Sequence, residues 1–348
     1  MGMFIKEMVS PVTLNILTSN ADPMMIRDES VARAVKELVK TIKSLELYPS
    51  LQSLIDRFEP IQKNRPTIYA HRVFYVWQMM QAGYQLMSLD LSKSDFLQSN
   101  SLKCQAAFLN ILFDDICDLG RDKALFNKCV LALQGQIDQD EGELCQLISD
   151  TWSTFQSTIV QTPNYVLLKP FLEEAYQHWI GSFEYSLAIQ RESFRIEEKW
   201  ERHLELISPS TFIHMAGLID LLFVPNFPTH QTASAIKVFL QAQKMGQLGN
   251  WASTWERELA QEDFTGGVYR IALENGWIAW DDLKRGSPEK IREQIRNSPV
   301  ETYLWDEWKR LRAESYQTRQ EIQLSALNGY VESFSAIMFM LVGSTGLV

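Results

Sequence analysis

The sequence predicts an all-α fold, because apolar residues recur at helical spacing along most of the chain and no convincing run alternates like a strand. Val31, Ala34, Val35, Leu38 and Val39 show the spacing that marks one buried helix face. The composition is globular, with 46% hydrophobic and 22% charged residues. No repeat and no Pro/Gly/Ser-rich linker divides the 348 residues. We therefore expect a single domain over residues 1–348 with ten or more helices.

Residues 1–30, with Pro11 and Pro23, are expected to be irregular, and helices are expected from about Ser30 onward. The turn residues Ser208-Pro209 and Gly266-Gly267 predict two of the breaks between helices. After the first helix, helical patterns occupy residues 48–58, 70–90, 101–119, 122–135, 141–160, 165–188, 195–207, 210–223, 231–260, 263–275, 287–296 and 300–340.

Charge and cysteine usage exclude several classes of protein. The net charge of −10 argues against nucleic acid as a partner, and an anionic ligand would need cations to mediate its contact. None of the cysteines forms a CxxC pair or has a histidine at ligand spacing, so a reduced, cytoplasmic protein without zinc is expected. The N-terminus lacks the pattern of a signal peptide, and the longest apolar run, Ala336 to Val342, is too short to span a bilayer.

The first candidate site is a group of aspartates at the end of an apolar helix. Asp114 and Asp118 are four residues apart and share a helix face, and Asp115 lies about 100° away around the helix. Three neighbouring carboxylates repel one another unless a cation binds, and hard oxygen ligands suit Mg²⁺. The alternative is a solvated acidic helix end, and the pattern alone does not exclude it.

The second candidate site lies 136 positions downstream. Asn250, Thr254 and Glu258 follow one another at four-residue steps and offer an amide oxygen, a hydroxyl and a carboxylate along one side of a helix. Arg257 adjoins them and could contact a phosphate oxygen. A polar helix stripe would look the same, but two oxygen clusters of this kind in one chain make coincidence improbable.

Together the two clusters resemble the motifs of microbial class I terpene synthases. Asp114, Asp115 and Asp118 match the DDxxD motif, and Asn250, Thr254, Arg257 and Glu258 match the NSE motif. The resemblance implies an α-helical barrel of the isoprenoid synthase type, with the motifs facing each other across its mouth. It further implies three Mg²⁺ ions, with Mn²⁺ as an alternative, that bridge the motifs to the diphosphate of an isoprenyl substrate.

The chain departs from the family pattern at several positions. Trp251 stands where the family usually has Asp, and Leu204 stands near the position of the diphosphate-sensing Arg. Arg202 is carried over as a candidate sensor, Ser208 at the predicted helix break as the candidate effector residue, and Tyr330 as a candidate contact to the diphosphate.

The C-terminal helix is expected to pack beside the mouth of the site, with the tail after Gly343 folding over the opening. Phe74, Trp77, Phe108 and Phe113 are the candidate pocket rings, although rings at such positions belong to ordinary core more often than to a pocket.

The function that the resemblance implies is ionisation of an isoprenyl diphosphate, followed by cyclisation or rearrangement of the carbocation. The aromatic-rich chain with its N-terminal extension favours geranylgeranyl diphosphate (C20) over farnesyl diphosphate (C15). A chain-elongating prenyltransferase of the related fold and a non-catalytic helical scaffold stay open as alternatives. No nucleic acid and no membrane span are expected, and a homodimer is left open.

Overall fold

The computed structural model describes residues 5–19, 28–64, 74–119, 121–136, 142–191, 199–327 and 329–343, and helices are the only regular secondary structure in them. The predicted all-α fold is thereby confirmed. The helices are α1 (Ile5–Met8), α2 (Pro11–Ser19), α3 (Glu29–Ile42), α4 (Pro49–Asn64), α5 (Phe74–Leu86), α6 (Lys93–Asp114), η2 (Asp115–Leu119), α7 (Lys123–Leu133), α8 (Glu143–Ile159), α9 (Tyr165–Arg191), α10 (Trp200–Ile207), η3 (Ser208–Thr211), α11 (Ile213–Leu221), η4 (Thr229–Gln231), α12 (Thr232–Ala260), α13 (Gly267–Glu274), α14 (Trp280–Arg285), α15 (Pro288–Arg296), α16 (Val300–Gln320), η5 (Ser325–Leu327) and α17 (Tyr330–Gly343).

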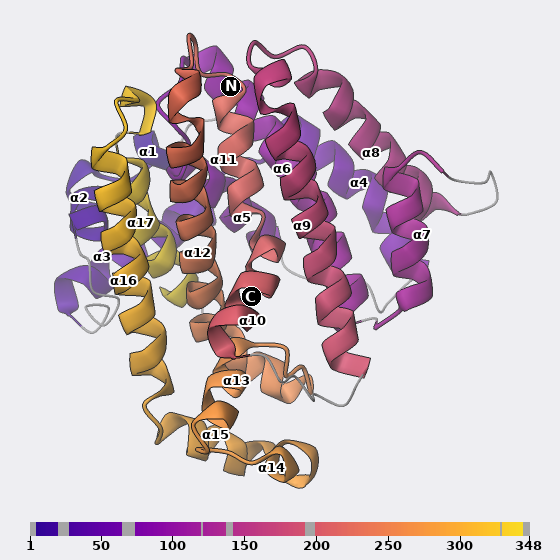
Figure 1. Ribbon diagram of the computed structural model, residues 1–348, viewed down its shortest axis with the longest axis vertical. Helices are drawn as coiled ribbons and strands as arrows, with labels where there is room; N and C mark the ends of the chain where they lie inside the picture. The colour runs from indigo at the N-terminus through magenta and orange to yellow at the C-terminus, as the bar shows by residue number, and fades with distance from the viewer. Residues whose placement is uncertain are drawn as a thin grey trace.

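A few central helices form the core, and the others pack around them (Figure 1). Every residue of α11 is buried, and α17 is buried over most of its length. The 29 residues of α12 span about 44 Å at 1.5 Å per residue. Because α12 packs against α11, α16 and α17, it is the helix around which this half of the molecule is built.

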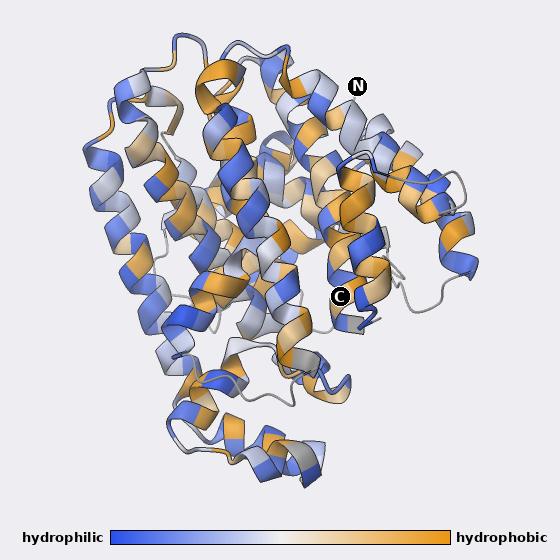
Figure 2. Cartoon of the chain, turned by 45° about the vertical axis from the view of Figure 1, so that its right-hand side comes forward, coloured by the Kyte–Doolittle hydropathy of each residue, from blue (hydrophilic) through white to orange (hydrophobic). Residues whose placement is uncertain are grey.

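The outer helices are amphipathic, as the spacing of their apolar residues predicts. Figure 2 shows hydrophilic and hydrophobic residues alternating along them. In α3 the residues of the predicted stripe from Val31 to Leu38 are buried. Asp28 caps this helix, because its carboxylate accepts hydrogen bonds from the backbone N–H groups of Ser30 and Val31.

The predicted boundaries hold in some places and are wrong in others. The expected break at Ser208-Pro209 is present, as the 3₁₀ turn η3, and Phe212 after it has a left-handed φ of 61°. The expectation of an irregular N-terminus is wrong for α1 and α2, whose Ile5 and Leu17 are buried in the core. The expected helix over 300–340 is divided between α16 and α17, with η5 between them.

One described stretch, Ser325–Gly343, is long and apolar enough to cross a membrane by composition alone. It includes α17, and 71% of its apolar window is buried inside the molecule. A buried core helix has the same composition as a membrane span, so this stretch is weak evidence for one.

A fully buried ion pair joins the central helices. The Lys103 ammonium on α6 lies 2.9 Å from Asp220 Oδ1 on α11, and neither side chain is more than 1% exposed. Lys103 also donates to Ser88 Oγ at 2.6 Å, and Asp220 also accepts from the Leu89 N–H at 3.0 Å. Ser99 Oγ donates to the same carboxylate. A buried pair needs such additional hydrogen bonds to offset its desolvation.

Removing one partner of this ion pair should therefore lower the free energy of unfolding more than removing both charges. We expect Lys103→Met to lower the free energy of unfolding by about 3–5 kcal/mol, because Asp220 is left buried and unpaired. Adding Asp220→Asn to Lys103→Met should recover much of the lost stability, since the amide oxygen still accepts a hydrogen bond. Urea unfolding measures both variants. Lys169→Met, which breaks an exposed pair with Glu173, is the control and should change stability by less than about 1 kcal/mol. A double variant no more stable than Lys103→Met would contradict this account.

Candidate active site

The first wall of the site is the end of α6. The α-helix ends at Asp114, and Asp115–Leu119 continue as a π-helical turn, η2. Such turns are frequent at functional sites. Ser186 on α9 donates a 2.7 Å hydrogen bond from its hydroxyl to Asp118 Oδ1, which fixes that carboxylate against the neighbouring helix.

The second wall is the last part of α12. Asn250, Arg257 and Glu258 all reach the same pocket as the three aspartates. Thr254 lies between them, and its hydroxyl contacts both the backbone carbonyl of Asn250 and the carboxylate of Glu258. The two sets of oxygen-bearing residues that the sequence singles out are thus brought together by the fold.

The pocket between these walls has a volume of about 150 Å³ and is mostly polar. Its lining comes from the end of α6 with η2, from α9, from the break between α10 and α11, from α12 and from the segment after α12. These residues are Asp114, Asp115, Asp118, Phe183, Ser186, Ile207, Ser210, Gln247, Asn250, Trp251, Arg257, Glu258, Gln261, Asp263, Thr265 and Gly266.

The segment after α12 supplies a third wall, which sequence reasoning missed. Residues 263–275 were expected to be helical, but α13 begins only at Gly267, and Asp263 lies in the preceding loop. Asp263 is 6% exposed, and its Oδ1 accepts hydrogen bonds from the N–H and the hydroxyl of Thr265 at 3.0 and 2.7 Å. Asp263 is therefore the fourth aspartate of the pocket and, with Glu258, its fifth acidic residue.

Arg121 links the first and third walls. It follows η2, and its guanidinium donates to the backbone carbonyls of Gln261 and Glu262 at 3.3 and 3.0 Å. Because these contacts go to backbone oxygens, no pairing of residue types in the sequence could have indicated them.

The carboxylates of the pocket hold their protons unusually tightly. Burial and the neighbouring Asp263 raise the pKa of Glu258 to about 8. The Asp114 side chain is exposed to the solvent in the pocket, but the protein around it removes part of its hydration. This desolvation, together with the negative charge of Asp263, raises the pKa of Asp114 to about 6. Burial and Asp114 raise the pKa of Asp118 as well. Asp114 and Glu258 also lie near the C-terminal ends of their helices, where the helix dipole disfavours anions and favours cations.

The residues of the pocket suit a divalent cation that is shared with an anionic ligand. Glu258 Oε2 is buried and has no hydrogen-bond partner among the described residues. A Cβ at position 266 would lie 2.7 Å from this oxygen, so Gly266 leaves the space around it open. No group of three His, Cys, Asp or Glu side chains in the described ranges is close enough to hold one ion alone. Carboxylates on separate walls are the donor set expected for Mg²⁺, which keeps water and substrate oxygens among its ligands.

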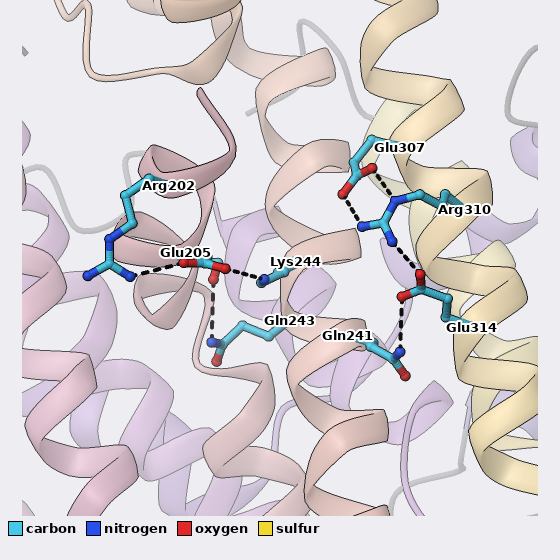
Figure 3. A network of polar contacts seen from close by, with 9 residues as sticks. Arg202, Glu205, Gln241, Gln243, Lys244, Glu307, Arg310 and Glu314 are labelled. Atoms are coloured by element: carbon cyan, nitrogen blue, oxygen red, sulfur yellow. Dashed lines mark hydrogen bonds and ion pairs between the residues drawn. The ribbon is translucent and has the colours of Figure 1, made fainter. Parts of the chain in front are cut away.

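Two of the predicted diphosphate contacts lie outside this pocket. Arg202 is exposed and pairs with Glu205 at 2.9 Å, and Glu205 also pairs with Lys244 of α12 (Figure 3). Together with Ser208, Arg202 lines a separate cavity of about 410 Å³. The carbonyl of Ser208 accepts from the hydroxyl of Thr211, and Ser210 reaches the first pocket instead.

Tyr330 is also placed away from the pocket, because of the direction of α17. Its ring packs 5.3 Å from that of Phe239, which precedes Asn250 by eleven residues, or about 16 Å of helix. A Cβ at Gly249 would lie 3.2 Å from Leu341. The start of α17 thus lies beside the first half of α12, and the end of α17 lies beside Asn250. The two helices run parallel, and this direction keeps Tyr330 away from the pocket. The predicted tail, residues 344–348, is outside the described residues.

The predicted pocket rings belong to the core as far as they are described. Trp77 stacks on Phe108 with 5.4 Å between ring centroids, and Phe113 packs against Phe126, Trp179 and Phe183. None of the three lines the carboxylate pocket. The side chain of Phe74 is outside the described residues.

Comparison with known proteins identifies the fold. No protein-family model and no curated protein sequence matches the chain. Among solved structures, the linalool/nerolidol synthase from Streptomyces clavuligerus in complex with 2-fluorogeranyl diphosphate is similar with a TM-score of 0.52 and 12% identity, over 87% of this chain and 97% of that one.

Two further solved structures are similar to this chain over most of its length. Germacradien-4-ol synthase from Streptomyces citricolor has a TM-score of 0.52 and 14% identity, over 86% of this chain and 94% of its own. Abietadiene synthase from Abies grandis has a TM-score of 0.56 and 12% identity, over 90% of this chain and 40% of its own. This chain has the all-α fold of the class I terpene synthases.

The raised pKa of Glu258 predicts a pH-dependent stability. Its ordinary pKa is 4.5 and its value in the fold is about 8, so the stabilisation from its protonated form is present below pH 4.5 and is lost as pH rises through 8. In chelator, the free energy of unfolding should fall by at least about 1.4 kcal/mol between pH 5 and 8 relative to Glu258→Gln. Urea unfolding across this range measures it. Identical pH profiles for the two proteins would show that Glu258 ionises freely.

Proposed function

We propose that this protein is a class I terpene synthase. It would ionise an isoprenyl diphosphate with the help of Mg²⁺ and cyclise or rearrange the allylic cation. The observation that carries the proposal is the meeting of Asp114, Asp115, Asn250 and Glu258 at one pocket, in a fold shared with terpene synthases. The complex of one such structure with 2-fluorogeranyl diphosphate supports the choice of ligand class.

The residues of the pocket divide into those that would hold cations and those that would contact the substrate. Asp114 and Asp115 on one wall and Asn250, Thr254 and Glu258 on the other would hold the magnesium ions, of which we expect three. When bound, magnesium ions offset the charge of the diphosphate and make it a better leaving group. Arg257 has an exposed side chain in the pocket lining, and its guanidinium would bind a diphosphate oxygen.

The reaction needs no acid from the protein. The allylic C–O bond breaks, its electron pair leaves with the diphosphate oxygen, and a carbocation stays behind in the site. Phe183 and Trp251 are the aromatic residues of the pocket lining, and their rings would stabilise positive charge. The cation then loses a proton from carbon to the released diphosphate, which gives the hydrocarbon product. We favour geranylgeranyl diphosphate over farnesyl diphosphate as the substrate.

The test is incubation with geranyl, farnesyl and geranylgeranyl diphosphate, with and without Mg²⁺. We expect Mg²⁺-dependent release of diphosphate and a volatile or hexane-soluble hydrocarbon, detected by gas chromatography and mass spectrometry. A longer prenyl diphosphate, formed when isopentenyl diphosphate is added, would show a prenyltransferase instead. No conversion of any substrate would contradict the proposal.

Substitutions in the two motifs should remove activity without unfolding the protein. We expect Asp114→Ala and Glu258→Gln each to lower kcat by about a hundredfold or more, since each removes an oxygen that would hold a cation. Asp118→Asn should be milder, about tenfold, because the amide oxygen can still accept from Ser186. Asp281→Asn, at an exposed position of α14, is the control. Full activity of Asp114→Ala at saturating Mg²⁺ would contradict the assignment.

A further inference from the structure

The turn that ends α12 places Asp263 beside Glu258. Glu262 has a left-handed φ of 55°, the N–H of Glu262 donates to the Leu259 carbonyl at 3.3 Å, and the N–H of Asp263 donates to the Glu258 carbonyl at 2.9 Å. These are the two hydrogen bonds of a Schellman turn. The backbone of Asp263 is therefore fixed directly to that of Glu258, and both side chains line the same pocket.

Position 251 explains why this loop stays against the helix. The family that the motifs resemble usually has Asp there, but Trp251 is buried, and its ring stacks on that of His203 at 5.5 Å and 8°. A Cβ at Gly267 would lie 2.2 Å from the Trp251 ring, so the start of α13, directly after the loop, approaches this ring as closely as a glycine allows. Trp251 thus contributes no carboxylate and packs instead against the segment that carries Asp263.

His203 connects the same segment to α10 and α9. His203 Nε2 lies 2.8 Å from the carbonyl oxygen of Thr265 and must donate, because a carbonyl can only accept. In the neutral ring Nδ1 then accepts, at 3.0 Å, from the hydroxyl of Tyr185. Thr265 in turn donates twice to Asp263 Oδ1. The Asp263 carboxylate is therefore held in place through a chain of hydrogen bonds from α9.

The pocket around Asp263 has more carboxylates than cationic side chains. Its lining includes five acidic residues and one basic residue, Arg257. Glu258 gives an independent sign that this pocket binds a cation. Its side chain is only 8% exposed, and its Oε2 has no hydrogen-bond partner among the described residues. A positioned carboxylate next to it would strengthen the binding of a cation there.

We propose that Asp263 is a further cation-binding carboxylate of this site, one that the two sequence motifs do not include. It acts toward the same divalent ions as Glu258, and it supplies from the loop the second acidic group that Trp251 cannot supply from the helix. The inference rests on the proposed function, because it assigns Asp263 to the Mg²⁺–diphosphate site of that reaction.

The test measures the Mg²⁺-dependent binding of inorganic diphosphate by calorimetry, which requires no turnover. Asp263→Asn removes the charge but keeps an oxygen that accepts from Thr265, so the loop should keep its conformation. We expect binding to weaken by about tenfold or more. Glu262→Gln, the neighbouring exposed carboxylate outside the pocket lining, is the matched control and should stay within about twofold of the wild type.

The thermal unfolding midpoint gives a second readout. In chelator the midpoint of Asp263→Asn should equal or exceed that of the wild type, because one of the mutually repelling carboxylates is gone. The rise on adding Mg²⁺ and diphosphate should be smaller than for the wild type.

A different result would separate this inference from the proposed function. If Asp263→Asn binds like the wild type while Asp263→Ala and Asp114→Asn lose binding, Asp263 is only a structural cap of the loop, and the inference is wrong although the site stands. If the wild type shows no Mg²⁺-dependent binding and Asp114→Asn changes nothing, the proposed function fails and the inference fails with it.

Discussion

The repulsion between carboxylates at one pocket is the constraint on which the arrangement of this site depends. Burial raises the pKa values of Asp114, Asp118, Glu258 and Asp263, and neighbouring carboxylates raise those of the first three further. The C-terminal ends of α6 and α12 add the negative ends of two helix dipoles to the same region. Such a site is costly without cations, and its carboxylates are the type of ligand that hard divalent cations prefer.

The scaffold has to keep these groups together despite their repulsion, and the long helices do this. On α12, Asn250 and Glu258 belong to one unbroken helix, so their spacing cannot relax. The buried pair of Lys103 and Asp220 ties α6 to α11, which in turn packs against α12. The free energy from burying α11 and α17 in the core therefore also holds the two walls at a fixed separation.

How much could be predicted from the sequence depended on the kind of contact. Helical periodicity predicted the fold class, and regular four-residue spacing predicted that Asp114, Asp118, Asn250 and Glu258 would each face one side of a helix. That the two sets meet at one pocket followed only from the resemblance to a known family. Spacing within a helix is local, whereas the meeting of two helices depends on the packing of the whole chain.

The missed and misplaced residues have other causes. Arg121 and His203 act through backbone carbonyls, which every residue type has, so no pattern of side chains marks them. Asp263 was missed because it was assigned to a helix over 263–275, whereas it lies in the loop before α13. The expectation for Tyr330 depended on the direction of α17 relative to α12, and apolar periodicity does not indicate direction.

Backbone strain is concentrated at the same place as charge. Among the described residues other than glycine, positive φ angles occur at Arg121, Phe212, Asn226 and Glu262. Three of these lie one or two residues after the ends of η2, η3 and α12, the three helical elements that end at the pocket. A left-handed residue without glycine costs about 1 kcal/mol or more. Strain of this kind persists only where surrounding contacts fix it, as Arg121 does by bonding the carbonyl of Glu262. Because the three elements end here, Asp118 of η2, Ser210 of η3 and Glu258 of α12 all lie near a helix end and line the same pocket.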